Sequence, residues 1–238
     1  TFFTWKKNEF EKFAEMYKKI NLPFWCQTRI ETISEEKLKL LKDIGCARIS
    51  FGIEHGNENF RRKYLHRPVS NKLMLKNFKI VQNSEIPFSV NNIIGFPHET
   101  RELAFDTIEF NRQIDANDRN AYAFTPFHGT PLRQEVERLG YLNYNQISKS
   151  LVAGIEDNPL DMKEFSKSEI AKIIKTFNMY VKFPKTRWKE IKKAEENTDE
   201  GNKIYNDLKI EFKELYFNDS SQNFEASALE SDIKSPMN

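Results

Sequence analysis

The chain has 238 residues, of which 39% are hydrophobic, including 20 phenylalanines, so it can bury the core of one large domain or two small ones. Its 37 basic and 35 acidic side chains nearly cancel. This balance argues against a dedicated nucleic-acid binder, because such proteins concentrate basic residues on one face. The sequence contains neither an apolar run of about 18 residues nor the apolar core of a signal peptide, so we expect a soluble, cytoplasmic protein without membrane contact.

Strand and helix patterns alternate in the first half of the chain. Residues 23–30 form an apolar strand pattern, Ser34 is placed to cap the helix that follows, and Gly45 is placed to end that helix. The second strand pattern spans 46–55, and Ser70 is placed to cap the helix after it.

Two further strand–helix units follow, with strand patterns at 86–96 and 120–129 and helical patterns starting at Arg101 and Pro131. Four such units in a row imply parallel strands joined by right-handed crossovers. The order of elements alone fits both an open α/β sheet and a barrel.

Side-chain alternation in the second strand favours the barrel. The small or polar positions Arg48, Ser50 and Glu54 alternate with the apolar positions Ile49 and Phe51. A strand of an open sheet that helices cover on both sides is apolar on both faces. One apolar and one polar face instead fit a barrel that holds a polar ligand, with the ligand site at the carboxyl ends of the strands.

Residues that can carry chemistry gather at the four strand ends, which are "CQTR" at 26–29, "GIEHG" at 52–56, "IIGFPHET" at 93–100 and "TPFHGT" at 125–130. A carboxylate such as Glu54 can accept two hydrogen bonds from a vicinal diol, as a ribose presents. Arg29 or Arg67 can pair with a ligand carboxylate. Glycines in these segments let a flat ring approach the backbone.

Other interpretations of the strand ends stay open. The histidines in them are His55, His98 and His128. They suggest a metal site, although no HxH or HExxH spacing accompanies them. Glu54 can also form an internal ion pair with Arg48 or Arg29, and the glycine and proline residues can serve as turns alone. The residues by themselves therefore indicate a site for a polar, nucleoside-like ligand.

The pattern changes after the fourth helix. Ser166 and Glu169 have capping-box spacing before a helix that Pro184 ends. Charged helical patterns follow at 186–196 and 202–217, and a polar, aperiodic stretch comes last. We expect a barrel portion at 1–142, a helical extension at 143–217 and a disordered tail at 218–238.

The four strand-end motifs together resemble the radical S-adenosylmethionine superfamily, and most closely its members with an N-terminal cobalamin-binding domain. Their order and spacing match over about residues 1–142: a GIESG-like end at 52–56, a leucine–x–arginine step at 65–67, a GLPGET-like end at 95–100 and a P-x-x-GT turn at 126–130. The resemblance implies the C-terminal part of a partial (β/α) barrel with parallel strands, followed by a helical tail.

The resemblance also implies roles for individual residues. Glu54 takes the ribose hydroxyls of S-adenosylmethionine, and Arg67 pairs with its methionine carboxylate. Ile93 and Gly95 lie along the adenine. Two further residues point into the barrel near the cofactor or substrate: Gln27 and Arg29. Two positions depart from the family pattern, since His55 stands where serine is usual and His98 where glycine is usual. The histidine at 55 would put a titratable group beside Glu54, the carboxylate assigned to the ribose. The histidine at 98 would narrow the strand end assigned to the adenine.

The cysteines mark the largest departure. The family reaction needs a four-iron four-sulfur cluster held by three cysteines in a C-x-x-x-C-x-x-C loop. This sequence has only Cys26 and Cys46, in separate strand patterns, where we expect buried free thiols rather than a disulfide. "TFFTWKKNEFEKF" at the start of the chain resembles the family segment that follows the second barrel strand and precedes a helix. In the family, the cluster loop comes before this segment. We therefore expect the cluster cysteines and any cobalamin domain upstream of Thr1, and no radical activity in this fragment alone.

The resemblance implies a parent enzyme that cleaves S-adenosylmethionine to a 5′-deoxyadenosyl radical, which then abstracts hydrogen from a small-molecule or otherwise unknown substrate. A flavodoxin or ferredoxin would donate the electron. With cobalamin, methyl transfer is the commonest outcome. Two alternatives remain: a methylthiotransferase-like radical enzyme without cobalamin, and a cluster-free nucleoside-binding module without catalysis.

Overall fold

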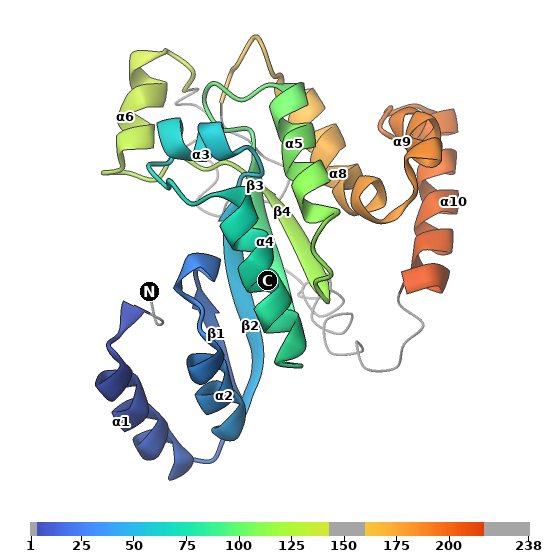
Figure 1. Cartoon of the computed structure of the whole chain (residues 1–238). Helices are drawn as coiled ribbons and strands as arrows, with labels where there is room; N and C mark the ends of the chain where they lie inside the picture. The colour runs from blue at the N-terminus through green and yellow to red at the C-terminus, as the bar shows by residue number, and fades with distance from the viewer. Residues whose placement is uncertain (1–3, 143–159, 217–238) are drawn as a thin grey trace, which may run out of the picture. The chain divides into compact units, whose positions relative to one another are not determined.

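The computed structural model describes residues 4–142 and 160–216. The chain divides into two compact units, Thr1–Lys182 and Phe183–Asn238. The sheet and the helices around it belong to the first unit (Figure 1).

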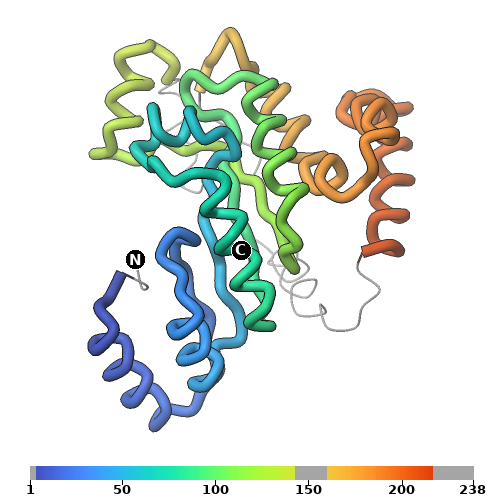
Figure 2. Tube along the Cα trace, in the orientation of Figure 1, coloured from blue at the N-terminus to red at the C-terminus, as the bar shows by residue number. Residues whose placement is uncertain are grey.

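Four parallel strands form one sheet in the order β1-β2-β3-β4. They are β1 Phe24–Thr28, β2 Cys46–Glu54, β3 Phe88–Ile94 and β4 Asp118–Ala123. The Cα trace runs up each strand and returns through helical structure before the next strand begins (Figure 2). This arrangement confirms the predicted α/β class with parallel strands.

Helices follow the strands where the sequence predicts them: α2 Glu35–Asp43, α4 Asn71–Asn83, α5 Arg101–Asn111 and α6 Pro131–Arg138. The predicted caps form, because Ser34 Oγ accepts a hydrogen bond from Lys37 N at 3.3 Å and Ser70 Oγ accepts one from Leu73 N at 3.2 Å. Gly45 has φ +86°, the left-handed conformation that ends α2. One short helix, α3 Glu58–Tyr64, was not predicted.

The two faces of the sheet differ as the alternation predicts. On the face that α2, α4 and α5 cover (Figure 1), Ile49 and Phe51 are fully buried and Phe51 packs edge-on against Phe78 of α4. On the opposite face, Asn91 Nδ2 donates to Ser50 Oγ at 2.7 Å. The apolar face forms the core, and the polar face is left for the interior of the partial barrel.

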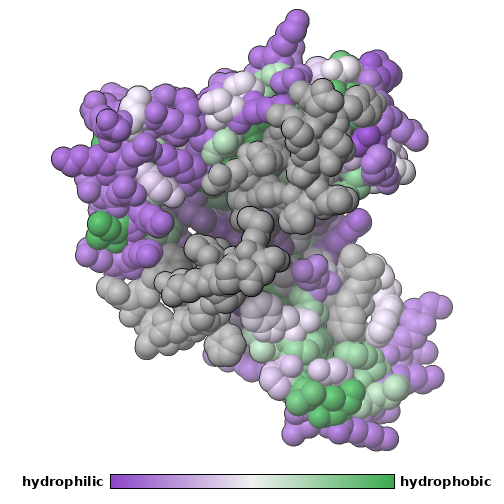
Figure 3. All heavy atoms as spheres, turned by 180° about the vertical axis from the view of Figure 1, so that it is seen from behind, coloured by the Kyte–Doolittle hydropathy of each residue, from purple (hydrophilic) through white to green (hydrophobic). Residues whose placement is uncertain are grey.

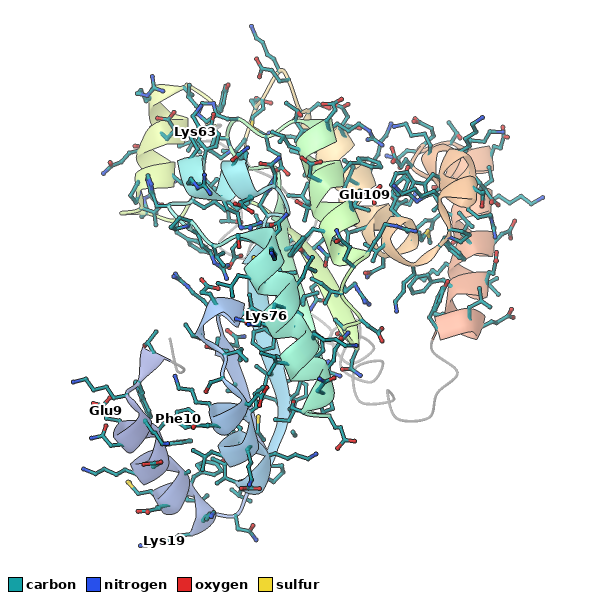
Figure 4. The ribbon with its side chains drawn as sticks, viewed as in Figure 1. Glu9, Phe10, Lys19, Lys63, Lys76 and Glu109 are labelled. Atoms are coloured by element: carbon teal, nitrogen blue, oxygen red, sulfur yellow. The ribbon has the colours of Figure 1, made fainter. Side chains whose placement is uncertain are left out.

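Helix α1, Lys7–Lys18, packs beside the edge strand β1. Phe10 is fully buried, and Figure 4 shows it on the inner side of this helix. The stretch between α1 and β1 keeps apolar side chains exposed, with Ile20 at 56% and Leu22 at 61%. Figure 3 shows a hydrophobic area at the lower end of a mostly hydrophilic surface.

Helix α8, Lys167–Lys182, belongs to the first unit and contacts β4 and α5. It begins with the predicted capping box: Ser166 N donates to Glu169 Oε2 at 3.1 Å, and Glu169 N donates to Ser166 Oγ at 3.3 Å.

The second unit is helical, with a 3-10 turn at Lys185–Arg187, α9 Trp188–Ala194 and α10 Asp199–Tyr216. Arg187 joins the two ends of this unit through two hydrogen bonds to Glu211, at 2.8 and 2.9 Å. The helical tail is therefore present. The predicted boundaries at 142 and 217 stay predictions, and the tail at 218–238 lies outside the described residues. Among the described helices, none combines the length and apolar character of a membrane span.

Candidate functional site

The polar face of the sheet ends in a cavity of about 780 Å³. One residue from each strand end lines it: Arg29, Glu54, Ile93 and Tyr122. Each of them continues the polar row of its own strand, so the alternation that the sequence shows also determines which side chains reach the cavity. The cavity therefore lies at the carboxyl ends of the parallel strands, the place where the sequence predicts a ligand site.

Glu54 is held in an unusual position at the end of β2. Its backbone has φ +66°, a conformation that non-glycine residues rarely adopt, and its side chain folds back over Gly52. A methyl group on Gly52 would overlap Glu54 Oε1, so the glycine provides the space for the carboxylate. Burial raises the pKa of Glu54, against the opposing charges of Arg67 and Arg29. No hydrogen bond from the described residues reaches this carboxylate.

Arg67 lies beside Glu54 but is engaged elsewhere. Its Nε and Nη2 donate to Glu31 at 2.9 and 2.6 Å, and its Nη1 donates to the carbonyl oxygen of Gly52 at 2.7 Å. The distance from Nη1 to Glu54 Oε1 is 3.9 Å. Arg67 thus lines the cavity with most of its donors already used inside the chain, and its predicted pairing with a ligand carboxylate stays a prediction.

Arg29 and Gln27 lie on the same face of β1 and its continuation, and both are exposed. Arg29 lines the cavity, whereas Gln27 lies one strand repeat away and does not. The Arg29 guanidinium makes neither a hydrogen bond nor an ion pair within residues 4–142 and 160–216. It is therefore a cation of the cavity that a ligand can reach.

The two residues predicted at the third strand end, Ile93 and Gly95, lie in different places. Ile93 lines the cavity, while Gly95 is buried behind it with φ +90°. Glu99 holds this turn, because its Oε2 accepts hydrogen bonds from Gly95 N at 2.5 Å and from Phe96 N at 2.9 Å. Gly95 is thus placed to shape the turn beside the cavity.

His55 turns away from the cavity. It is fully buried, stacks on Phe60 with ring centroids 4.2 Å apart, and places Nε2 3.2 Å from Glu99 Oε1 without hydrogen-bond alignment. Its Nδ1 accepts a hydrogen bond from Asn57 N at 3.0 Å, so the ring proton is on Nε2 and faces Glu99. The expectation that this histidine stands beside the Glu54 carboxylate is wrong. The positive φ of Glu54 interrupts the strand before His55.

His98 braces one wall of the cavity. Its ring stacks on Tyr64 with centroids 4.8 Å apart, and its Nε2 lies 2.9 Å from Glu135 Oε1. Tyr64 and Glu135 line the cavity, and His98 joins them from behind. The third predicted histidine, His128, is exposed. The described residues contain no group of three or more His, Cys, Asp or Glu side chains placed to hold a metal.

Residues that the sequence reasoning missed complete the site. Aromatic side chains form much of the remaining wall: Tyr64, Phe96, Tyr122, Phe124 and Phe127. Lys63 extends from α3 at the end of the sheet where the strands finish (Figure 4). An open carboxylate, a reachable arginine and a wall of flat apolar rings suit a ligand with a sugar diol, a charged end and a planar base.

A four-iron four-sulfur cluster does not fit the residues present. It needs three neighbouring thiolates. Cys26 and Cys46 are free, as predicted, but only Cys46 is buried. Their Sγ atoms lie 4.0 Å apart on β1 and β2, and the sequence has no third cysteine. Neither thiol lines the cavity. No step of a reaction through the cluster can be derived from this chain.

Part of the chain matches a known protein family. Residues 6–110 match the model of the Radical SAM superfamily. An uncharacterized methyltransferase, PH0819, of Pyrococcus horikoshii is 24% identical over 176 residues, which cover 72% of this chain and 37% of the relative. A biotin synthase of Persephonella marina is 33% identical over 128 residues, 53% of this chain and 37% of the relative.

The fold has a solved counterpart. The coproporphyrinogen III oxidase HemN of Escherichia coli, described as a radical SAM enzyme, aligns with a TM-score of 0.55 and 13% identity over 76% of this chain and 38% of that one. The chain spans 37% of the length of each curated relative, so the activity of a whole protein does not transfer to it directly. The family match over residues 6–110, the parallel sheet and the strand-end motifs together show that this part of the chain is similar to the radical SAM superfamily.

Proposed function

We propose that this chain forms the S-adenosylmethionine-binding part of a radical SAM enzyme, with Glu54 accepting hydrogen bonds from the ribose hydroxyls. One observation carries the proposal: the Glu54 carboxylate lies over Gly52 at the cavity wall and accepts no hydrogen bond from the described residues. A partly buried carboxylate without donors is costly unless a ligand supplies them. A ribose supplies two hydroxyl donors.

The rest of the cavity is assigned by the same reasoning. Adenine would lie along Ile93 and the aromatic wall, with the Gly95 turn behind it. The motif resemblance assigns the methionine carboxylate to Arg67, but the Glu31 contact favours Arg29, whose guanidinium is open. Gln27, one repeat below Arg29, would face the substrate.

The superfamily implies two cofactors, S-adenosylmethionine and a four-iron four-sulfur cluster. When bound, S-adenosylmethionine would supply a 5′-deoxyadenosyl radical. We propose that a longer protein provides the cluster cysteines and acts on a small-molecule substrate in the cytoplasm, with an electron from a flavodoxin or ferredoxin. The motif resemblance favours cobalamin and methyl transfer, and the name of the Pyrococcus relative supports methyl transfer.

Calorimetry with S-adenosylhomocysteine tests the ligand assignment on the 238-residue chain. We expect wild-type chain to bind, and Glu54→Gln to bind about tenfold to a hundredfold more weakly, because hydrogen bonds to a charged acceptor contribute about 1.5–3 kcal/mol. Glu109→Gln on α5 is the matched control, since this carboxylate does not line the cavity. Equal affinity of the Glu54 and Glu109 variants would refute the assignment.

The parent reaction needs a separate test on a longer protein, reconstituted with iron and sulfide without oxygen. We expect 5′-deoxyadenosine to form from S-adenosylmethionine, and a bound corrinoid to give its visible absorption spectrum. Product without a corrinoid would support the enzyme without cobalamin. Binding without iron and without product would support the cluster-free module.

A further inference from the structure

Glu31, which the motifs do not include, has a distinctive contact. It lies in the single 3-10 turn Ile30–Thr32 after β1, and both of its carboxylate oxygens accept hydrogen bonds from the buried Arg67, 36 residues away. This two-point geometry is the strongest pairing that an arginine makes with a carboxylate. Burial opposes ionisation of Glu31, yet the hydrogen bonds from Arg67 hold its pKa below the usual value.

Arg67 has a second carboxylate within reach. Its Nη1 is 3.9 Å from Glu54 Oε1 and donates instead to the carbonyl oxygen of Gly52. A small rotation of the guanidinium would bring it into direct contact with Glu54. Two sets of hydrogen bonds hold the guanidinium as it is: the pair to Glu31 and the one from Nη1 to the carbonyl oxygen of Gly52.

We propose that Glu31 is a positioning residue: by holding Arg67 in a two-point pair, it keeps this arginine from closing on Glu54 and leaves the Glu54 oxygens open to the ribose of the ligand. The proposal rests on the function proposed for Glu54. It also assigns Arg67 a new role, as a brace for the end of β2 through the carbonyl of Gly52, in place of contact with the ligand carboxylate.

The charge distribution around Glu54 fits this role. The groups whose charge acts on it are Arg67, Arg29 and Glu31, and the cavity wall adds Lys63 and His66. A free arginine so close to a partly buried carboxylate would pair with it, because the pair is only weakly screened there. Glu31 is the residue that competes for Arg67, at 2.6 Å against 3.9 Å for Glu54.

Two variants of Glu31 separate its hydrogen bonds from its charge. Glu31→Ala releases Arg67, so we expect the chain to bind S-adenosylhomocysteine about tenfold more weakly even at high pH, where Glu54 is fully ionised. Glu31→Gln keeps one acceptor for Arg67, and its affinity at high pH should stay within about threefold of wild type. A simple packing role would weaken binding equally in both variants.

The opposite outcome has a clear meaning. If Arg67 must be freed to take the ligand carboxylate, Glu31→Ala will bind as tightly as wild type or more tightly, and the proposal is overturned. If wild-type chain does not bind S-adenosylhomocysteine, the function proposed for Glu54 fails by itself.

A measurement without ligand then tests whether Glu31 keeps Arg67 away from Glu54. Carboxyl ¹³C titration of labelled chain, with the signal assigned through Glu54→Gln, should show Glu54 titrating at lower pH in Glu31→Ala than in Glu31→Gln. Both variants lose the negative charge, but only the alanine variant lets Arg67 approach. Equal midpoints would overturn the proposal.

Discussion

The carboxylate of Glu54 occupies the space that a side chain on Gly52 would fill. Both residues point to the polar face of β2, and the side chain of Glu54 folds back along the strand over Gly52. The position of the Glu54 carboxylate therefore requires a glycine at 52. The backbone conformation does not require one, since Gly52 does not have a positive φ. This relationship separates an effect on the ligand site from an effect on the fold.

Gly52→Ala should weaken ligand binding and leave stability almost unchanged. The added methyl group displaces the end of a flexible side chain, which costs little, but it moves the Glu54 carboxylate away from its place. We expect the affinity for S-adenosylhomocysteine to fall about tenfold by calorimetry, with a melting temperature within about 2 °C of wild type. Unchanged affinity would show that the observed carboxylate position is not the binding position.

Gly56→Ala is the matched substitution four residues further on, with the opposite expected result. A methyl group there would overlap backbone atoms of Asp106 and Thr107 in α5, which cannot move aside as a side chain can. Gly56 N also donates to Thr107 Oγ1 at 2.8 Å. We expect a loss of about 1–3 kcal/mol in the free energy of unfolding, measured with denaturant. A neutral result would mean that α5 is not held against the end of β2.

Arg29→Ala should affect only ligands that carry a carboxylate. The Arg29 side chain is exposed and unengaged within the described residues, so its removal should leave the melting temperature unchanged. We expect S-adenosylhomocysteine to bind about tenfold more weakly, while adenosine binds as it does to wild type. An equal loss for both ligands would place Arg29 at the nucleoside instead.

The sequence predicts the sheet well because its local signals agree with one another. Ser34, Ser70 and Gly45 begin and end the helices that they were expected to, and the alternation in β2 places Glu54 on the cavity side. The short helix α3 was missed, although Asn57, whose side chain accepts a hydrogen bond from Phe60 N, was a readable cap.

The site itself was only partly predictable. The alternation of side chains along β2 does not predict which way His55 points, because the strand ends at Glu54, whose φ is positive. Glu31 was missed for another reason: its partner Arg67 is 36 residues away, and no local spacing reports such a contact. Long-range pairs between loops are set by the tertiary fold, so the motifs alone assigned Arg67 to the ligand.

Glu99 should contribute to the stability of the fold rather than to ligand binding. It is buried, and one of its oxygens accepts hydrogen bonds from both Gly95 N and Phe96 N in the turn after β3. Glu99→Ala removes the acceptor of two buried amide groups, so we expect a loss of about 2–4 kcal/mol in denaturant unfolding. Glu15→Ala on the exposed side of α1 is the control and should change stability by less than about 0.5 kcal/mol. Similar losses in both variants would contradict this account of the turn.

Glu135 should make a contribution to stability that depends on pH. Its carboxylate accepts hydrogen bonds from Arg138 at 2.8 and 2.9 Å and lies 2.9 Å from His98 Nε2. Arg138 first, and His98 second, lower the pKa of Glu135 from about 4.5 to about 2. A carboxyl group with a lowered pKa in the folded state stabilises the fold above its unfolded pKa, and this stabilisation is lost as the pH falls towards the folded value.

Glu135→Gln should therefore be less stable than wild type at pH 6, and the difference should shrink from about pH 4.5 downward. Denaturant unfolding at pH 6, 4 and 3 measures it. His98→Asn removes the weaker partner only, so its difference from wild type should be smaller than that of Glu135→Gln. A gap between wild type and Glu135→Gln that stays constant down to pH 3 would mean that the ionised carboxylate does not stabilise the fold, because only an ionised group loses its contribution on protonation.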